Sequence, residues 1–378
     1  MASWRWLLVL WQLSGLQMGE SGVTTIKRDH QRNLYNMTLA GDGIYLVSLY
    51  TNPNCRGCPS SSSFTVALLR PHATLSLLTV ESAKNTGVLA EVATALKEDD
   101  VLSLSMSGPE KNPVPFTITY VSGLDGHYTT VVTTSPSNSA LLHFNKQLTG
   151  GSWRELSGNH ASSFSVPTTG MYWVTARVVP DNFEAPVTVM TENGAHTRLL
   201  FRIFRQSHVA VSCSGAFYLK AGSVVRVKNP IGATYAAGTL LSFVYLQGNR
   251  RPYTAPDEHI AFAGFLTDTL LRACDGVLLF PSHRTDYGGL YASGGNFTIR
   301  RSGTYLISVR GVPPPNAAAF FDLIVNDKVT GISFADEGVP SGQTFPVHLD
   351  ANDRLKVVTR NSCILEAGTL FSIALIST

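Results

Sequence analysis

The chain has little of what marks nucleic-acid-binding and membrane-spanning proteins. Charged residues make up only 15% of its 378 positions, and the formal net charge is +3. Nucleic-acid binding normally requires a concentrated basic face, so this balance argues against that class of partner. After residue 20, no apolar run approaches the roughly 20 residues that span a bilayer, and we predict no membrane span.

Catalytic motifs are missing as well. The sequence contains no Gly-x-Ser-x-Gly elbow, no His-Glu-x-x-His motif, no phosphate-binding loop and no dinucleotide-binding glycine pattern. Its 10 histidines share no spacing, so surface and turn positions suit them better than roles as bases or ligands. We expect no enzymatic activity and no cofactor. An active site assembled from distant loops is the alternative that sequence leaves open.

Residues 1–20 differ from everything that follows. Arg5 supplies a positive charge before an apolar stretch that runs from Trp6 to about Leu16. This pattern is typical of a secretory signal peptide, and its apolar part is short for a bilayer span, so a retained signal anchor is the weaker alternative. The C-terminal segment lacks the pattern of a lipid-anchor signal. We predict a secreted, extracellular protein.

The 5 cysteines are too few for a dense disulfide scaffold. Cys55 and Cys58 stand in a Cys-Arg-Gly-Cys segment flanked by prolines, which predicts a loop. A local disulfide suits such a loop better than a redox-active pair. Of Cys213, Cys274 and Cys363, at least one is free or pairs between chains, and a Cys274–Cys363 bridge is one arrangement among several.

Two triplets match the acceptor pattern for N-glycosylation. They are Asn36-Met-Thr38 and Asn296-Phe-Thr298. The pattern has physical meaning only on the surface of a protein in the secretory route. Such triplets also arise by chance, but these two precede the same landmark in two copies of a repeat. We therefore predict glycosylation at Asn36 and Asn296.

Glycine and proline are plentiful, with 32 and 19 residues, which favours many short strands joined by turns. One pattern occurs three times: a large apolar residue, a glycine six positions later and a tyrosine two positions after that. We interpret the glycine as a tight turn between two strands. The three copies are Met37, Gly43, Tyr45; Phe164, Gly170, Tyr172; and Phe297, Gly303, Tyr305.

Two more landmarks follow in the same order. A turn leading into a strand recurs at 96–104, 219–227 and 349–357, and an Ala-Gly-Thr-Leu segment opens the last strand at 237–240 and 367–370. The strands at 172–176, 240–246 and 305–309 are apolar on both faces, so we expect both faces to be covered. The landmarks predict three all-β modules at 21–121, 127–246 and 259–378, after the signal at 1–20.

This order of landmarks resembles the globular-head module of C1q, a member of the C1q and tumour-necrosis-factor superfamily. The resemblance is best in 259–378, good in 127–246 and degenerate in 21–121, where the leading strand is missing. It implies ten-stranded jelly rolls that pack as trimers. The collagen-like stalk of the family is absent, and no acidic cluster is shared by the copies, so its calcium sites do not carry over. We read Asp99, Asp100 and Asp353 as solvated turn residues.

Three modules in one chain suggest that one polypeptide supplies all three positions of a trimer; a homo-oligomer is the alternative. Residues 122–252 hold 11 Lys and Arg against 5 Asp and Glu, so the second copy is the best candidate for an acidic partner. Ordinary solvated arginines are the other interpretation. The predicted polyanion-binding residues are Arg198, Arg202, Arg205, Arg226 and Lys228.

These features together predict a secreted binding protein with an extracellular protein or glycan ligand. Its role in this interpretation is innate-immune pattern recognition. The alternative is a cytokine-like or structural extracellular protein that engages a receptor or matrix partner. Fold alone does not separate the two, because function depends on loops and surfaces that vary on one scaffold.

Overall fold

The structure is a computed structural model, and it describes 20 stretches of the chain. They are residues 23–29, 34–39, 41–51, 62–71, 73–82, 88–107, 116–124, 126–150, 154–155, 162–179, 186–203, 210–229, 233–246, 259–266, 270–271, 276–292, 294–314, 319–335, 341–360 and 364–378. Within these stretches the regular elements are β-strands, without a helix. The prediction of an all-β fold is confirmed. The predicted signal peptide lies outside the described residues.

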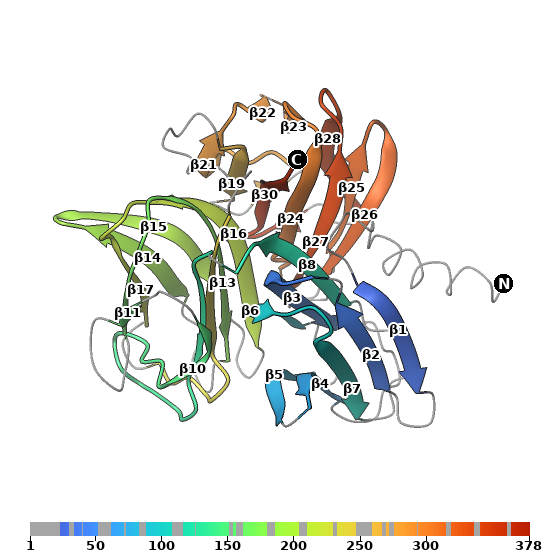
Figure 1. The fold of residues 1–378 in the computed structure, drawn as a ribbon. Helices are drawn as coiled ribbons and strands as arrows, with labels where there is room; N and C mark the ends of the chain where they lie inside the picture. Colours follow the sequence, from blue (N-terminus) through green and yellow to red (C-terminus); the bar gives the residue numbers. More distant parts are fainter. Residues whose placement is uncertain are drawn as a thin grey trace.

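The strands form three sandwiches of two antiparallel sheets each (Figure 1). We call them the first, second and third sandwich in chain order, and in each the inner sheet is the one facing the other two. The first sandwich has a five-stranded outer sheet and, among the described residues, a three-stranded inner sheet. Its outer sheet has the order β1 (Val23–Asp29), β2 (Leu34–Leu39), β7 (Val101–Ser107), β4 (Ser62–Arg70), β5 (Ala73–Ser82). Its inner sheet has the order β6 (Val88–Leu96), β3 (Gly43–Thr51), β8 (Phe116–Ser122).

The second sandwich has five strands in each sheet. The inner order is β10 (Lys146–Gly150), β9 (Tyr128–Val132), β18 (Leu240–Tyr245), β13 (Gly170–Val178), β16 (Val211–Leu219). The outer order is β11 (Arg154–Glu155), β12 (Ser163–Ser165), β17 (Val224–Lys228), β14 (Val187–Asn193), β15 (His196–Ile203). Successive strands cross between two facing antiparallel sheets, which is a jelly roll.

The third sandwich repeats this order. Its inner sheet is β21 (Ser282–Tyr287), β19 (Ala261–Phe265), β30 (Leu370–Ser377), β24 (Gly303–Gly311), β27 (Ser341–Leu349). Its outer sheet is β22 (Tyr291–Ala292), β23 (Asn296–Thr298), β28 (Arg354–Arg360), β25 (Ala319–Val325), β26 (Lys328–Ala335). A further pair joins β20 (Leu270–Leu271) to β29 (Ile364–Leu365).

Each sandwich has its own apolar core, and a fourth cluster joins all three. That joint cluster includes Ile44 and Leu46 of β3, Trp173 of β13 and Leu306 of β24. It explains why β13 and β18 are buried along their whole length: one face packs in its own sandwich and the other against a neighbour. The expectation that the inner strands are covered on both faces is confirmed.

Equivalent edge strands of the three inner sheets meet about a common axis. Strands β6, β16 and β27 are the edges beside β3, β13 and β24, and each contacts the other two. The sandwiches then follow one another around the axis: β6 also packs on β9 and β18, β16 on β19 and β30, and β27 on β3 and β8. In Figure 1 the three sandwiches surround this meeting point.

The repeated landmark residues occupy equivalent places. Met37, Phe164 and Phe297 are buried in the cores of the first, second and third sandwich. The tyrosine hydroxyl donates to the carbonyl four residues earlier in every copy: Tyr45 to Gly41 at 2.8 Å, Tyr172 to Thr168 at 2.7 Å and Tyr305 to Arg301 at 2.7 Å. This bond fixes the chain where it enters the first long inner strand.

The landmark glycines have a different role from the one predicted. Gly43, Gly170 and Gly303 are the first residues of β3, β13 and β24 and not tight turns. They are needed because a neighbour approaches closely: a Cβ would lie 2.4 Å from a ring carbon of Tyr245 at Gly170 and 2.3 Å from the carbonyl oxygen of Ser377 at Gly303. A side chain at either position would force the last strand of the sandwich away.

The second landmark does form a turn in all three copies. The amide of the fourth residue donates to the first carbonyl, at 3.0 Å for Asp100 and Ser223 and 3.1 Å for Asp353. The third residue adopts a left-handed backbone in each, with φ of 66° at Asp99, 77° at Gly222 and 74° at Asn352. Gly, Asn and Asp tolerate this conformation best, which explains why the copies differ there only among those residue types.

Candidate interaction surfaces

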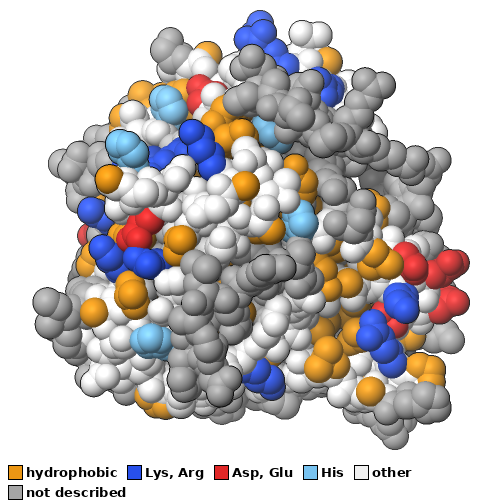
Figure 2. Space-filling model, turned by 60° about the vertical axis from the view of Figure 1, so that its left-hand side comes forward, with side chains coloured by type: hydrophobic (Ala, Val, Ile, Leu, Met, Phe, Trp, Pro, Cys, Tyr) orange, Lys and Arg blue, Asp and Glu red, His pale blue; other side chains and the backbone are white. Residues whose placement is uncertain are grey.

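The outer sheet of the second sandwich carries a row of two exposed cations. Cross-strand pairing places Lys228 of β17 and Arg202 of β15 on either side of Thr188 of β14. Both cations are exposed, and neither has an ion-pair partner among the described residues. In Figure 2 Lys and Arg side chains are spread over the left part of the view, where acidic side chains are few. We call Lys228, Thr188 and Arg202 the basic row.

Arg226 lies next to the basic row, but its charge is already compensated. Its Nη1 forms an ion pair with Glu192 of β14, and its Nε donates to Ser163 Oγ at 2.9 Å. The guanidinium thus joins strands β12, β17 and β14 of the outer sheet. Its attraction for an external anion is reduced, because the carboxylate of Glu192 already neutralises the positive charge of the guanidinium.

Arg198 belongs to a different surface. It pairs across the sheet with Thr191, on the core side of β15, and its guanidinium reaches the carbonyl oxygens of Tyr218 and Arg284. Arg284 belongs to β21, so Arg198 links the second and third sandwiches. Burial lowers the pKa of Arg198. The structure therefore does not bring Arg198 together with the basic row, and the predicted Arg205 lies outside the described residues.

The predicted modification sites fall in different surroundings. Asn296 begins β23 and is exposed. Asn36 lies within β2, and its side-chain oxygen is buried without a hydrogen-bond partner among the described residues. The predicted pair Cys55 and Cys58 lies outside the described residues, as do Cys274 and Cys363.

Cys213 is a buried free thiol next to Arg310 of the third sandwich. Burial raises its pKa to about 11, against the opposite effect of the neighbouring Arg310. A thiol that is both buried and protonated at neutral pH is a poor nucleophile, so Cys213 has the character of a structural residue.

A buried carboxylate lies where the sandwiches meet. Glu91 of β6 is fully buried, and its oxygens accept hydrogen bonds from Ser48 at 3.2 Å and from Thr175 and Ser214 at 2.5 Å each. Trp173 Nε1 adds a longer contact of 3.4 Å. Thr175, Ser214 and Trp173 belong to the second sandwich, so Glu91 joins the first sandwich to the second. Sequence reasoning missed Glu91, because the other two copies carry Ser214 and Thr344 at this position.

Two further buried charges were also missed, although the repeat could have revealed them. Arg177 and Arg310 are equivalent residues of β13 and β24. Each donates to the carbonyl of the glycine in the Ala-Gly-Thr-Leu segment of its own copy. The distances are 2.9 Å to Gly238 and 3.0 Å to Gly368. Superposing the copies would have found this signal, because Arg177 and Arg310 both lie seven residues after the glycine that begins the strand.

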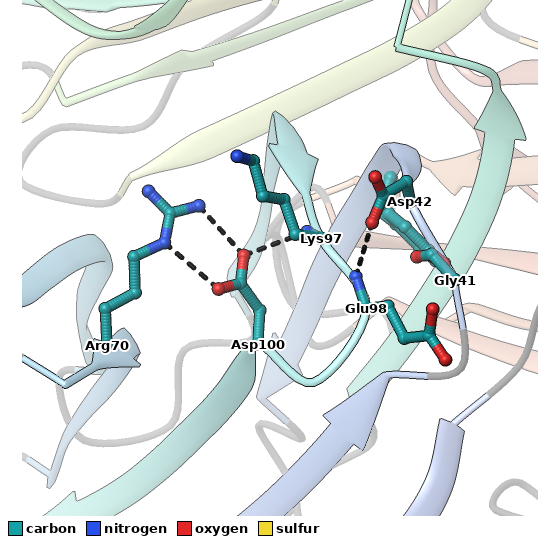
Figure 3. A network of polar contacts seen from close by, with 7 residues as sticks. Gly41, Asp42, Arg70, Lys97, Glu98 and Asp100 are labelled. Atoms are coloured by element: carbon teal, nitrogen blue, oxygen red, sulfur yellow. Dashed lines mark hydrogen bonds and ion pairs between the residues drawn. The ribbon is translucent and has the colours of Figure 1, made fainter.

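In the turn at 97–100, Lys97, Glu98 and Asp99 are exposed, but the side chain of Asp100 is part of a polar network (Figure 3). Asp100 is only 8% exposed and receives Arg70 Nε at 3.0 Å, Arg70 Nη2 at 2.8 Å and the Lys97 amide at 2.9 Å. Burial acts to raise the pKa of Asp100, but these hydrogen bonds hold it below the usual value. The prediction that Asp100 is solvated is wrong, because the β4 residue Arg70 folds over it.

Asp353, in the equivalent turn, accepts the amide of Asp350 at 2.8 Å and Asn326 Nδ2 at 2.7 Å. Within the described stretches no group of three or more His, Cys, Asp or Glu is placed to hold a metal ion. Over the same stretches no helix has the length and apolar character needed to cross a membrane.

Comparisons with known proteins give likenesses of fold at low similarity. No family model matches the chain, and no curated protein matches it. The crystal structure of murine APRIL at pH 8.0 aligns with 32% of this chain and 100% of its own, at 23% identity and a TM-score of 0.29. The triple jelly roll of an archaeal virus turret aligns with 95% of this chain and 86% of its own, at 12% identity and a TM-score of 0.22. At these scores the likenesses say nothing about ligand or activity.

Proposed function

We propose that this chain is a secreted, non-enzymatic binding protein of the C1q and tumour-necrosis-factor type, and that the second sandwich contacts a polyanionic ligand. The observation that carries the proposal is the basic row: two exposed cations flank Thr188 without an acidic partner among the described residues. Sulfated glycans and acidic protein faces supply the matching charge. The three modules at 21–121, 127–246 and 259–378, secretion and pattern recognition are parts of this proposal.

The pseudo-threefold arrangement supports a single-chain design. Because β6, β16 and β27 meet within one polypeptide, the three outer sheets belong to one molecule and are free to carry different surface chemistry. The first sandwich carries the uncharged residues Ser105, Thr65 and Thr79 at the positions where the second carries Lys228, Thr188 and Arg202. One face of the molecule can therefore bind a ligand that the other two do not.

Heparin serves as the probe for this proposal. Arg202→Ala with Lys228→Ala is expected to weaken heparin binding about threefold to tenfold, because each exposed charge contributes up to about 1 kcal/mol. The matched control is Lys328→Ala with Arg354→Ala, which removes the same charge from exposed positions of the third sandwich. Equal loss in both variants would reduce the effect to net charge and contradict the proposal. Loss of cell-receptor binding with heparin binding intact would favour the cytokine-like alternative.

A further inference from the structure

The inner sheet of the first sandwich ends where the other two continue. In the second sandwich the last strand, β18, pairs with β9, and in the third the last strand, β30, pairs with β19. We call β9 and β19 the leading strands. The equivalent last strand of the first sandwich is β8, and among the described residues only β3 pairs with it. One edge of β8 therefore has no strand beside it in the described part of the chain.

One hydroxyl-bearing residue recurs on the last inner strand of each sandwich, beside the position of the leading strand. Thr117, Ser242 and Ser372 are equivalent, because each lies opposite the axis-facing residue of the first long inner strand, Ser48, Thr175 or Ser308. Ser242 Oγ lies 2.9 Å from Thr130 Oγ1 of the leading strand β9. Ser372 Oγ donates to the carbonyl of Phe262 in the leading strand β19 at 3.0 Å. Both hydroxyls thus find a partner on the leading strand, which has no counterpart among the described residues of the first sandwich.

Thr117 has no such partner. Its Oγ1 is buried and makes no hydrogen bond among the described residues, and the same holds for Thr119 two positions along β8. Thr119 is only 4% exposed. A buried hydroxyl without a partner is costly, and natural proteins satisfy nearly all such groups. Two orphan hydroxyls on one strand, next to an unpaired edge, indicate a site that is completed by another group.

The neighbouring sandwich does not complete it. At the first junction the amide of Ala93 donates to Ser242 Oγ at 3.2 Å, and at the second the amide of Ala216 donates to Ser372 Oγ at 2.9 Å. The equivalent residue at the third junction is Pro346, opposite Leu306 in β24 as Ala93 is opposite Leu46 in β3. Proline has no amide hydrogen, so it cannot donate to Thr117. Thr117 lacks both partners that its equivalents have.

We propose that the edge of β8 is an acceptor site for an extended segment of a partner protein, which adds to the inner sheet as an antiparallel strand. The backbone groups of β8 supply affinity, as in other cases of β-strand addition. The second and third sandwiches indicate this occupant, because both have an antiparallel leading strand at the equivalent edge. Residues 23–29 are already paired with β2 in the outer sheet, so β1 is not available for this position.

The filled copies also specify the side chains that fit. The residue opposite Thr117 corresponds to Thr130 and Ala263, so it is small. The residue opposite Ile118 corresponds to Thr129 and Phe262, which are buried on the core side. Both leading strands are uncharged: Tyr128–Val132 is YTTVV and Ala261–Phe265 is AFAGF. We therefore expect an uncharged partner segment of about five residues with a small side chain at its centre.

A labelled peptide copying residues 127–133, HYTTVVT, tests the proposal on the full chain. Fluorescence anisotropy is expected to show saturable binding, and hydrogen exchange is expected to show protection of residues 116–122. Thr117→Val should weaken binding of this peptide about threefold to tenfold, because one hydrogen bond is lost. A second peptide, in which Val replaces Thr130, cannot form this hydrogen bond. The Thr117→Val variant should bind that second peptide as tightly as the native chain binds it.

The matched control is Leu75→Lys on β5, the exposed edge of the outer sheet in the same sandwich. It should leave peptide binding unchanged. Absence of saturable binding together with unchanged exchange at 116–122 would overturn the proposal, and so would equal loss in the Leu75→Lys variant. If 116–122 is protected only in a dimer of the chain, the occupant is a second copy and the choice of a partner protein is wrong. Heparin binding should not respond to Thr117→Val, so this test and that of the basic row fail independently.

Discussion

At the scale of single residues, the three landmark tyrosines connect the fold to alkaline pH. Burial raises the pKa of Tyr45 and of Tyr305 to about 12, from an ordinary value of 10.0. Between pH 10 and 12 the unfolded chain releases these protons while the folded chain retains them. The stability that is fully present below pH 10 is therefore lost as the pH rises toward 12. Thermal unfolding at pH 9 and pH 11.5 should show a clear fall, and Tyr305→Phe should make that fall smaller. An equal fall in the variant would contradict this role.

Glu91 leads to a second residue-scale prediction. Its carboxylate accepts hydrogen bonds from Thr175 and Ser214, whose hydroxyls would face an amide NH₂ or lose one acceptor in Glu91→Gln. Hydrogen bonds to charged groups contribute about 1.5–3 kcal/mol each, so we expect a loss of about 2–4 kcal/mol and a lower urea midpoint. Glu98→Gln, at an exposed turn position, is the control and should change little. Equal midpoints for Glu91→Gln and the native chain would show that the buried carboxylate is dispensable.

At the scale of strands, the third junction differs from the other two by one amide. Pro346→Ala restores the N–H group that Ala93 and Ala216 use at the first and second junctions. In a double-mutant cycle with Thr117→Val, the restored donor should couple to the hydroxyl by about 0.5–1.5 kcal/mol. The four proteins are compared by denaturant unfolding. A coupling energy near zero would mean that β27 does not reach Thr117 even when it carries a donor.

The strand scale also shows what sequence could and could not predict. The turn at 350–353 was predictable, because a left-handed residue restricts the choice to Gly, Asn or Asp and leaves a visible signature. The function of Gly303 was not, because its need arises from the carbonyl of Ser377, which lies far along the chain. Periodicity likewise predicted inner strands with two apolar faces, but it gave no sign of Glu91, which has no counterpart in the other copies.

The basic residues of the second sandwich were likewise only partly predictable from the sequence. Charge counting placed the basic residues in the second copy, and Lys228 and Arg202 do lie in one row of its outer sheet. It did not separate them from Arg198, because the strand register and the bulge at Leu200 of β15 decide which arginine faces solvent and which faces the third sandwich. A count of charged residues in a segment does not tell which face of the sheet each side chain lies on, and a binding surface needs the side chains on one face.

At the scale of the whole molecule, the contacts among β6, β16 and β27 make all three sandwiches one compact body. A compact chain of 378 residues has a radius of gyration of about 21 Å, whereas three sandwiches spaced along a line would give a clearly larger value. Small-angle scattering should yield the compact value, and light scattering should yield the mass of one chain at every concentration. Because the sandwiches already occupy all three positions around the axis, no place remains for a second chain there. A trimer mass, or a scattering profile of three separated bodies, would contradict the intramolecular assembly.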